Sequence, residues 1–251
     1  MQNKKEAKRV MPNCNFFPKN CRGSHVGMIL SFVVFISCLI FIYTILEPVV
    51  NTQKSKQNLI TNLEIELTEK FSNNLITAII ANDSNPDIYD CIRINNTELN
   101  TSGLNAIAKN NLGEIKNSSI NGSYLFLDWS DNETYFKIYY SEEEFEEYNL
   151  TRACNPTNNY YQGLITWKKQ VFVSRVRETA KEYEINYDSL KSELKVPLDS
   201  DFSFRFKLSN GTEIKTKEIN ISKDVYVQEF PIQYLDERAD IKFGSLTIRA
   251  W

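Results

Sequence analysis

The sequence predicts an α+β protein: a long N-terminal helix followed by an antiparallel, β-rich region with two or three short helices. Two patterns predict this class. One uncharged apolar run lies near the N-terminus, and after it come short segments of alternating polarity separated by turn residues. The chain has 251 residues, enough for one large domain or two small ones, and 12% of them are aromatic, too many for a disordered chain.

The apolar run covers residues 26–46, which contain no charge. A helix of that length spans about 31 Å, close to the thickness of the hydrocarbon core of a bilayer. A cleaved secretory signal would have a shorter apolar core and a small-residue cleavage site, and residues 47–50 (EPVV) offer none. A buried helix of a soluble protein would carry regular polar positions, which this run lacks. The pattern therefore favours a transmembrane helix over residues 24–47.

Charges on the two sides of this run predict its orientation. Residues 1–24 carry six basic side chains and one acid, Glu6, whereas residues 47–251 carry 23 Lys and Arg against 31 Asp and Glu. By the positive-inside rule, residues 1–23 form a basic cytoplasmic tail or cleaved leader, and residues 82–251 form an extracellular head on the plasma membrane. The acidic balance also argues against a nucleic-acid partner and leaves the lipid bilayer as the expected one.

Asparagine and cysteine usage agree with export. Only Cys91 and Cys154 lie beyond the apolar run, and two cysteines in an oxidising compartment predict one disulfide, the alternative being two separate buried thiols. Every Asn-x-Ser/Thr pattern also lies beyond the run, which favours a glycosylated surface, the alternative being a chain that is simply rich in asparagine. The candidate glycosylation residues are Asn82, Asn95, Asn100, Asn117, Asn121, Asn132, Asn149, Asn210 and Asn220.

An amphipathic stalk is predicted over residues 48–81. Pro48 predicts a kink or the end of the membrane helix. Beyond it, apolar residues recur at every fourth position from Leu59 to Leu75, so one face of a helix is apolar. That face packs on the head or on a neighbouring copy, and the head is the simpler choice. Residues 76–81 are β-branched enough to form a strand instead.

Alternating segments predict the strands of the head. The segments 124–129 and 135–140 flank a turn and predict a hairpin, and the Asn210-Gly211 turn predicts a stronger one between 201–208 and 212–216. A basic group at 168–169, 175 and 177 is expected to meet the acidic segment 141–148, within the fold or on a partner. Further strands are expected at 91–94, 163–173, 225–234 and 241–251, and helices at 141–148, 174–183 and 189–194.

The segment Arg22-Gly23-Ser24-His25-Val26-Gly27-Met28, with its apolar continuation, resembles the N-terminus of archaeal type IV pilin-like proteins. These have a basic leader, a glycine at the processing point and an apolar helix that continues as a stalk into a β-rich head. The resemblance implies cleavage after Gly23 by a prepilin-type peptidase, Ser24 as the new N-terminus, and like subunits in a homo-oligomer. Met28 stands where assembling pilins carry glutamate, so an uncleaved anchor stays open.

No motif predicts catalysis. The chain lacks phosphate-binding, dinucleotide-binding, nucleophile-elbow and zinc-protease patterns, and its single histidine, His25, lies at the edge of the apolar run. Asp128, Asp131 and Asp201 could serve as paired carboxylates in a glycosidase, but each lies in or beside a turn signal. We expect no catalytic, cofactor-binding or metal-binding residue.

These patterns together predict a single-pass, membrane-anchored cell-surface protein with a pilin-like structural or adhesive role. The alternative is a monomeric bitopic glycoprotein whose extracellular head binds a ligand or partner protein. An extracellular hydrolase is a remote third option.

Overall fold

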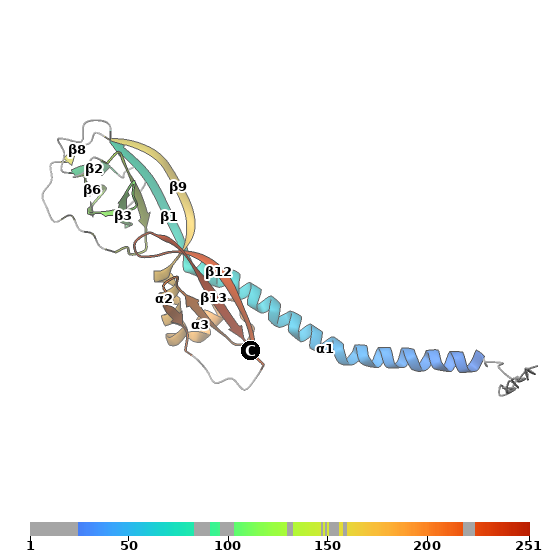
Figure 1. Cartoon of the computed structure of the whole chain (residues 1–251). Helices are drawn as coiled ribbons and strands as arrows, with labels where there is room; N and C mark the ends of the chain where they lie inside the picture. Colours follow the sequence, from blue (N-terminus) through green and yellow to red (C-terminus); the bar gives the residue numbers. More distant parts are fainter. Residues whose placement is uncertain are drawn as a thin grey trace, which may run out of the picture. The chain divides into compact units, whose positions relative to one another are not determined.

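The computed structural model describes residues 25–82, 91–95, 103–129, 133–146, 148, 150, 156–157, 160–217 and 224–251. It divides into two compact units, residues 1–53 and residues 54–251, and we call the second one the folded unit. The protein is mixed α+β and rich in β-strands, as predicted (Figure 1). Its helices are α1 (His25–Phe71), α2 (Val173–Ile185) and α3 (Tyr187–Glu193).

The described strands form two sheets. The larger has the order β11-β10-β13-β12-β9-β1-β7-β3-β4, and the smaller has the order β5-β6-β2-β8. The strands are β1 (Ser72–Asn82), β2 (Cys91–Asn95), β3 (Asn105–Asn110), β4 (Ile115–Lys116), β5 (Ser118–Asn121), β6 (Tyr124–Asp128), β7 (Tyr135–Ser141), β8 (Pro156–Thr157), β9 (Tyr160–Phe172), β10 (Phe202–Lys207), β11 (Glu213–Lys215), β12 (Tyr226–Leu235) and β13 (Ile241–Ala250).

Helix α1 runs as one helix through both the predicted transmembrane segment (24–47) and most of the predicted stalk (48–81), but it ends before the stalk was predicted to end. It continues through Pro48, so of the two expectations for this residue, a kink or an end, the end is wrong, because the proline removes only one backbone donor from a 47-residue helix. The helix stops at Phe71. Residues 72–75, predicted as part of the stalk helix, belong to β1 instead, and residues 76–81 form the strand that was the alternative for them. Asparagines at 73 and 74 are poor helix formers, and the β-branched residues that follow suit a strand.

The C-terminal part of α1 packs into the core of the folded unit. Leu63, Leu67 and Phe71 are almost fully buried in one cluster with side chains of α2, α3, β10, β12 and β13. The Phe71 ring lies 5.4 Å from that of Phe204 and 6.2 Å from that of Phe206. The apolar stripe of α1 is therefore covered by its own folded unit, and a neighbouring copy is not needed to cover it.

One predicted hairpin is confirmed near the C-terminus, and two further predicted strands pair there as a second hairpin. Strands β10 and β11 pair antiparallel around Asn210-Gly211, with Lys207 opposite Glu213 and Gly211 at φ +85°. Strands β12 and β13 pair along ten residues each, around the turn that begins at Asp236. This C-terminal half of the large sheet joins β9 through a short parallel contact, Tyr234 and Leu235 opposite Val171 and Phe172.

The segments 124–129 and 135–140 form strands, but the predicted pairing of the two strands as a hairpin is wrong. Strand β6 pairs with β2 and β5 in the small sheet, whereas β7 pairs with β1 and β3 in the large one. Leu125 and Leu127 of β6 lie in one buried cluster with Phe136 and Ile138 of β7. The two segments therefore face each other across a core between two sheets, which the alternating pattern alone does not distinguish from a hairpin.

The predicted acidic helix at 141–148 is also wrong. Ser141 ends β7, and the described residues that follow are not helical. Their burial alternates instead: Glu143 and Phe145 are buried, whereas Glu142 and Glu144 are exposed. This period of two marks an extended segment with one side toward the protein.

Candidate functional site

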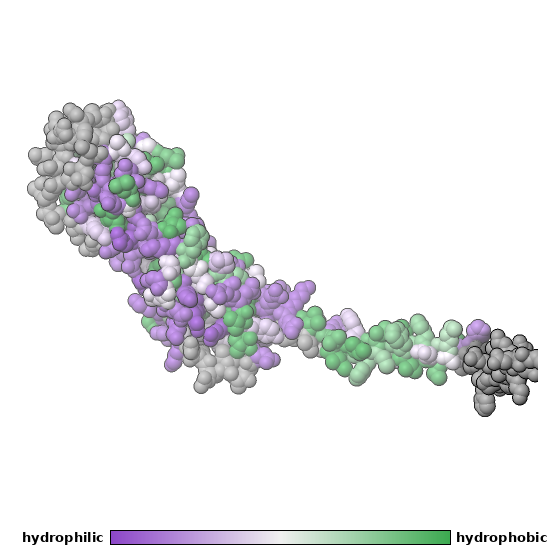
Figure 2. All heavy atoms as spheres, viewed as in Figure 1, coloured by the Kyte–Doolittle hydropathy of each residue, from purple (hydrophilic) through white to green (hydrophobic). Residues whose placement is uncertain are grey.

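The most distinctive surface of the described residues is the N-terminal part of α1. The 21 residues Gly27–Glu47 are long and apolar enough to cross a membrane, and none of them is buried by the rest of the protein. Phe32 and Phe41 are 63% and 66% exposed, values that would be costly on a surface in water. In Figure 2 this part of α1 is coloured mostly hydrophobic, whereas the surface of the folded unit is coloured more hydrophilic. A membrane anchor or a signal sequence fits this pattern.

The acidic segment after β7 contributes a buried ionic site to the folded unit, centred on Glu143. The Glu143 carboxylate accepts hydrogen bonds from Asn73 Nδ2 at 2.8 Å, Ser174 Oγ at 2.5 Å and Arg175 Nε at 2.5 Å. Its side chain is only 6% exposed. The basic residue Arg175 therefore meets the acidic segment within the fold, which is one of the two expected arrangements.

Burial alone would raise the pKa of Glu143. The hydrogen bonds from Ser174, Asn73 and Arg175 outweigh burial, and the pKa lies below its ordinary value of 4.5. Ser174 and Arg175 also stand in the first turn of α2, where the helix dipole favours a negative charge. With every partner supplied by the protein, this carboxylate is a structural link between β1, β7 and α2 and not a proton donor or acceptor poised for chemistry.

A groove of about 300 Å³ lies next to this link, lined by Arg177, Tyr234 and the residues around the β12–β13 turn. Its charges are paired with one another: Arg177 bonds Glu237, and Lys242 Nζ lies 2.5 Å from Asp236 Oδ2. Burial would raise the pKa of Asp236, but the Lys242 contact and backbone N–H groups lower it. A charged ligand would have to break these pairs, so the groove suits at most a neutral polar group.

The two described aspartates of the proposed carboxylate pair do not come together. Asp128 ends β6 in the small sheet, whereas Asp201 precedes β10 in the large one. Asp201 Oδ1 accepts from Tyr187 Oη at 3.0 Å and from Lys191 Nζ at 2.9 Å, so its role is to hold α3 against β10. Asp131 lies outside the described residues. Within the described ranges, no group of three or more His, Cys, Asp or Glu could hold a metal ion.

The other predicted sites lie partly within the described residues. Cys91 is fully buried at the start of β2, while Cys154 lies outside the described residues, so the disulfide stays a prediction. Gly23 and Ser24 also lie outside them. Among the glycosylation candidates, Asn82 ends β1. Exposed side chains are found at Asn95, Asn117, Asn121 and Asn210, and outside the described ranges fall Asn100, Asn132, Asn149 and Asn220.

Sequence reasoning missed the role of Glu143. The apolar Phe145 two positions later is the signal that could have found it, because the pair fits an extended segment with alternate burial.

Comparison with known proteins finds no match: no family model, no curated protein and no solved structure matches the chain.

Proposed function

We propose that the protein is a single-pass, membrane-anchored cell-surface protein with a pilin-like structural or adhesive role and no catalytic activity. The observation that carries the proposal is the bare apolar surface of α1 over Gly27–Glu47. Thirteen of these residues are Leu, Ile, Phe or Val. At about −0.3 to −0.6 kcal/mol each, they favour insertion into a bilayer by roughly 4 to 8 kcal/mol.

The continuity of α1 supports a pilin-like role in particular. The helix passes without interruption from this apolar surface into the core of the folded unit, where Leu63 and Leu67 are fully buried. One continuous helix that is apolar and bare in one part, and packed against an antiparallel sheet in the other, fits the architecture implied by the resemblance to archaeal type IV pilin-like proteins.

An extracellular position of the folded unit is part of the proposal. Positive charges before the apolar run, and the exposed Asn-x-Ser/Thr sites after it, support this orientation. The register of β2 with β8 supports a Cys91–Cys154 disulfide, because Cys91 stands opposite Pro156, two positions after Cys154 in the sequence.

A second candidate is a monomeric bitopic glycoprotein whose folded unit binds a ligand or partner. Two observations favour it. Met28 stands where assembling pilins carry an acid, and the apolar stripe of α1 is already covered within the chain. The two candidates differ in whether the leader is removed.

The N-terminus of the mature protein separates them. We expect mass spectrometry of the protein purified from membranes to find Ser24 as the first residue. A chain that begins at Met1 would contradict the pilin-like role and favour the bitopic glycoprotein. Recovery of the whole chain in the soluble fraction without detergent would contradict both.

A further inference from the structure

The sheet β11-β10-β13-β12 has one covered face and one open face. Phe202, Phe204 and Phe206 of β10 point into the core shared with α1, α2 and α3. Side chains alternate along a strand, so Ser203 and Arg205 lie on the other face. The antiparallel register places Ser203 opposite Arg249 of β13 and Arg205 opposite Thr247. The two arginines are therefore diagonal neighbours on the open face.

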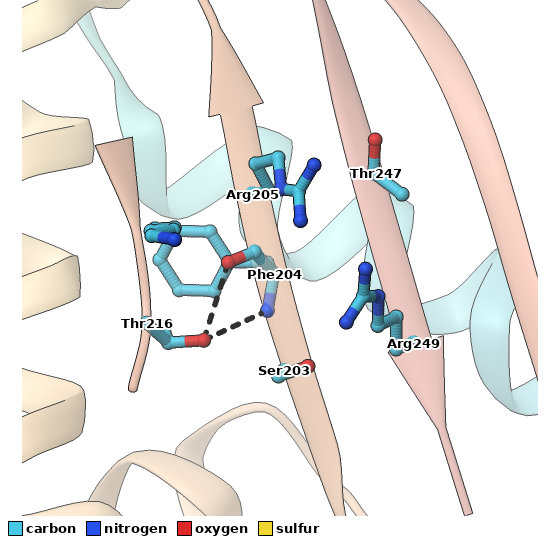
Figure 3. A pocket seen from close by; sticks show the side chains of 7 residues that line it. Ser203, Phe204, Arg205, Thr216, Thr247 and Arg249 are labelled. Carbon is cyan, nitrogen blue, oxygen red and sulfur yellow. Dashed lines mark hydrogen bonds between the residues drawn. The ribbon is translucent and has the colours of Figure 1, made fainter. Parts of the chain in front are cut away.

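The two guanidinium groups point toward each other (Figure 3). Both arginines line a hollow of about 10 Å³, together with Ser203, Phe204, Lys215, Thr216 and Thr247. The Thr216 hydroxyl is already engaged, because its Oγ1 accepts from Phe204 N–H and donates to Phe204 O, both at 3.2 Å. A hollow of this size holds about one water-sized group.

One cation beside the hollow, Arg249, lacks a partner among the described residues. Arg205 lies 3.6 Å from Glu213 Oε1, and both Arg205 and Lys215 have further interactions of their own. Arg249 is half-buried, and within the described part of the chain it makes no hydrogen bond or ion pair. Glu229, the acid on the same face of the neighbouring β12, makes none either. Two guanidinium groups that face each other repel, and an anion between them removes this cost.

We propose that Arg205 and Arg249 form a binding site for a carboxylate group carried by a larger molecule. One uncompensated cation matches a singly charged carboxylate better than a phosphate, whose charge is about −1.5 to −2 near neutral pH. Planar guanidinium groups on two neighbouring strands suit the two oxygens of one carboxylate. The small hollow admits one carboxylate oxygen, so the rest of the ligand lies above the sheet.

The test titrates sodium glucuronate into the full chain in a non-ionic detergent, at constant ionic strength against sodium chloride. Binding to the folded state raises the midpoint of thermal unfolding, followed by near-ultraviolet circular dichroism. For Arg249→Gln we expect that a glucuronate concentration about tenfold higher or more is needed to raise the unfolding midpoint by the same amount as in the wild type. Arg249→Lys retains part of the response, because it keeps the charge but loses the planar fork.

Lys207→Gln is the matched control, because Lys207 is an exposed cation on the same face of β10 that does not line the hollow. Its response to glucuronate should stay within about threefold of the wild type, as expected for a change in long-range charge only. No rise in the wild type, an equal rise in Arg249→Gln, or an equal loss in Lys207→Gln would overturn the proposal. Without glucuronate, Arg249→Gln should be at least as stable as the wild type, which shows that it folds.

Analytical ultracentrifugation of the wild type and Arg249→Gln, without glucuronate, identifies which molecule supplies the carboxylate. Self-association of the wild type that Arg249→Gln abolishes assigns it to an acidic side chain of a second copy. A monomeric wild type with an Arg249-dependent glucuronate response assigns it to a separate acidic molecule. Both results support the site, and neither depends on removal of the leader, so the test is independent of the one for the pilin-like role.

Discussion

The two parts of helix α1 have the same secondary structure and opposite surroundings. Over Gly27–Glu47 its apolar side chains are bare, whereas over residues 59–71 a four-residue repeat buries one side in the core and leaves the other polar. Ion pairs also hold the second part, with Lys70 Nζ 3.0 Å from Glu182 and 2.7 Å from Glu193. Sequence composition therefore decides the surroundings of each part of one helix: the first part is apolar and bare, and the second buries one side in protein.

The largest expected effect is the loss of a core contact in the second part. Phe71→Ala should lower the free energy of unfolding by about 4 kcal/mol, because Phe71 is 1% exposed and contacts the rings of Phe204 and Phe206. Denaturant unfolding in detergent measures the change. Phe35→Ala, a matched substitution in the bare part, should leave the stability of the folded unit within about 0.5 kcal/mol of the wild type. Equal losses would contradict the comparison.

A charge placed in the bare part should act on the membrane and not on the folded unit. Phe35→Lys should weaken bilayer insertion by about 3 kcal/mol and shift the protein toward the soluble fraction after carbonate extraction. Ile65→Lys is the control, because Ile65 is 59% exposed on the second part. If Ile65→Lys shifts the protein as much as Phe35→Lys, the division of α1 is wrong.

The next largest effect on stability is expected at the Glu143 carboxylate, which links β1, β7 and α2. Glu143→Gln should cost about 2 kcal/mol, since Arg175 and Ser174 lose a buried charged acceptor. Glu144→Gln, an exposed neighbour, should change little. Because the pKa of Glu143 is lowered in the fold, its stabilisation is present above pH 4.5 and disappears as the pH falls through the lower folded value. A difference in stability between the wild type and Glu143→Gln that stays the same in acid would contradict this assignment.

Alkaline pH should weaken the core that holds the second part of α1. Burial, with a smaller contribution from the Asp201 charge, raises the pKa of Tyr183 from 10.0 to about 12. The unfolded chain ionises first, so this contribution is complete below pH 10 and falls by about 2 kcal/mol as the pH approaches 12. Burial raises the pKa of Tyr187 as well. Tyr183→Phe should flatten the decline, and an unchanged slope in this variant would refute the assignment.

The smallest effect is expected at the surface of the second part. Lys195 pairs with Glu66 at 2.5 Å, but its side chain is 76% exposed. Lys195→Gln should cost less than about 0.5 kcal/mol, and added salt should remove the difference. A loss near that of Phe71→Ala would mean that ion pairs and not apolar packing hold α1.

Local patterns predicted the elements whose partners are adjacent in the sequence. The period of four from Leu59 to Phe71 predicted a buried helix face, and Asn210-Gly211 predicted the β10–β11 hairpin. Both depend on contacts within one element or across one turn, so the residues themselves carry the information.

Contacts between distant segments were beyond sequence reasoning. Strands β6 and β7 look like a hairpin, and only the pairing of β7 with β1 and β3 reveals that they belong to opposite sheets. Arg205 and Arg249 are 44 positions apart, and their approach follows from the β10–β13 register, which no local pattern specifies. Glu143 was missed for the same reason, since two of its partners come from α2 and one from β1.

The most direct test of the account is the labelling of lysines on intact cells with a membrane-impermeant amine reagent, followed by peptide mass spectrometry. Lys181 and Lys207 are exposed on the folded unit, whereas Lys4 and Lys5 precede the apolar run. We expect Lys181 and Lys207 to be labelled on intact cells. Any of the lysines before the apolar run that the mature chain retains should be labelled only after the cells are permeabilised. Labelling of Lys181 and Lys207 only after permeabilisation would contradict the proposed anchor and its orientation.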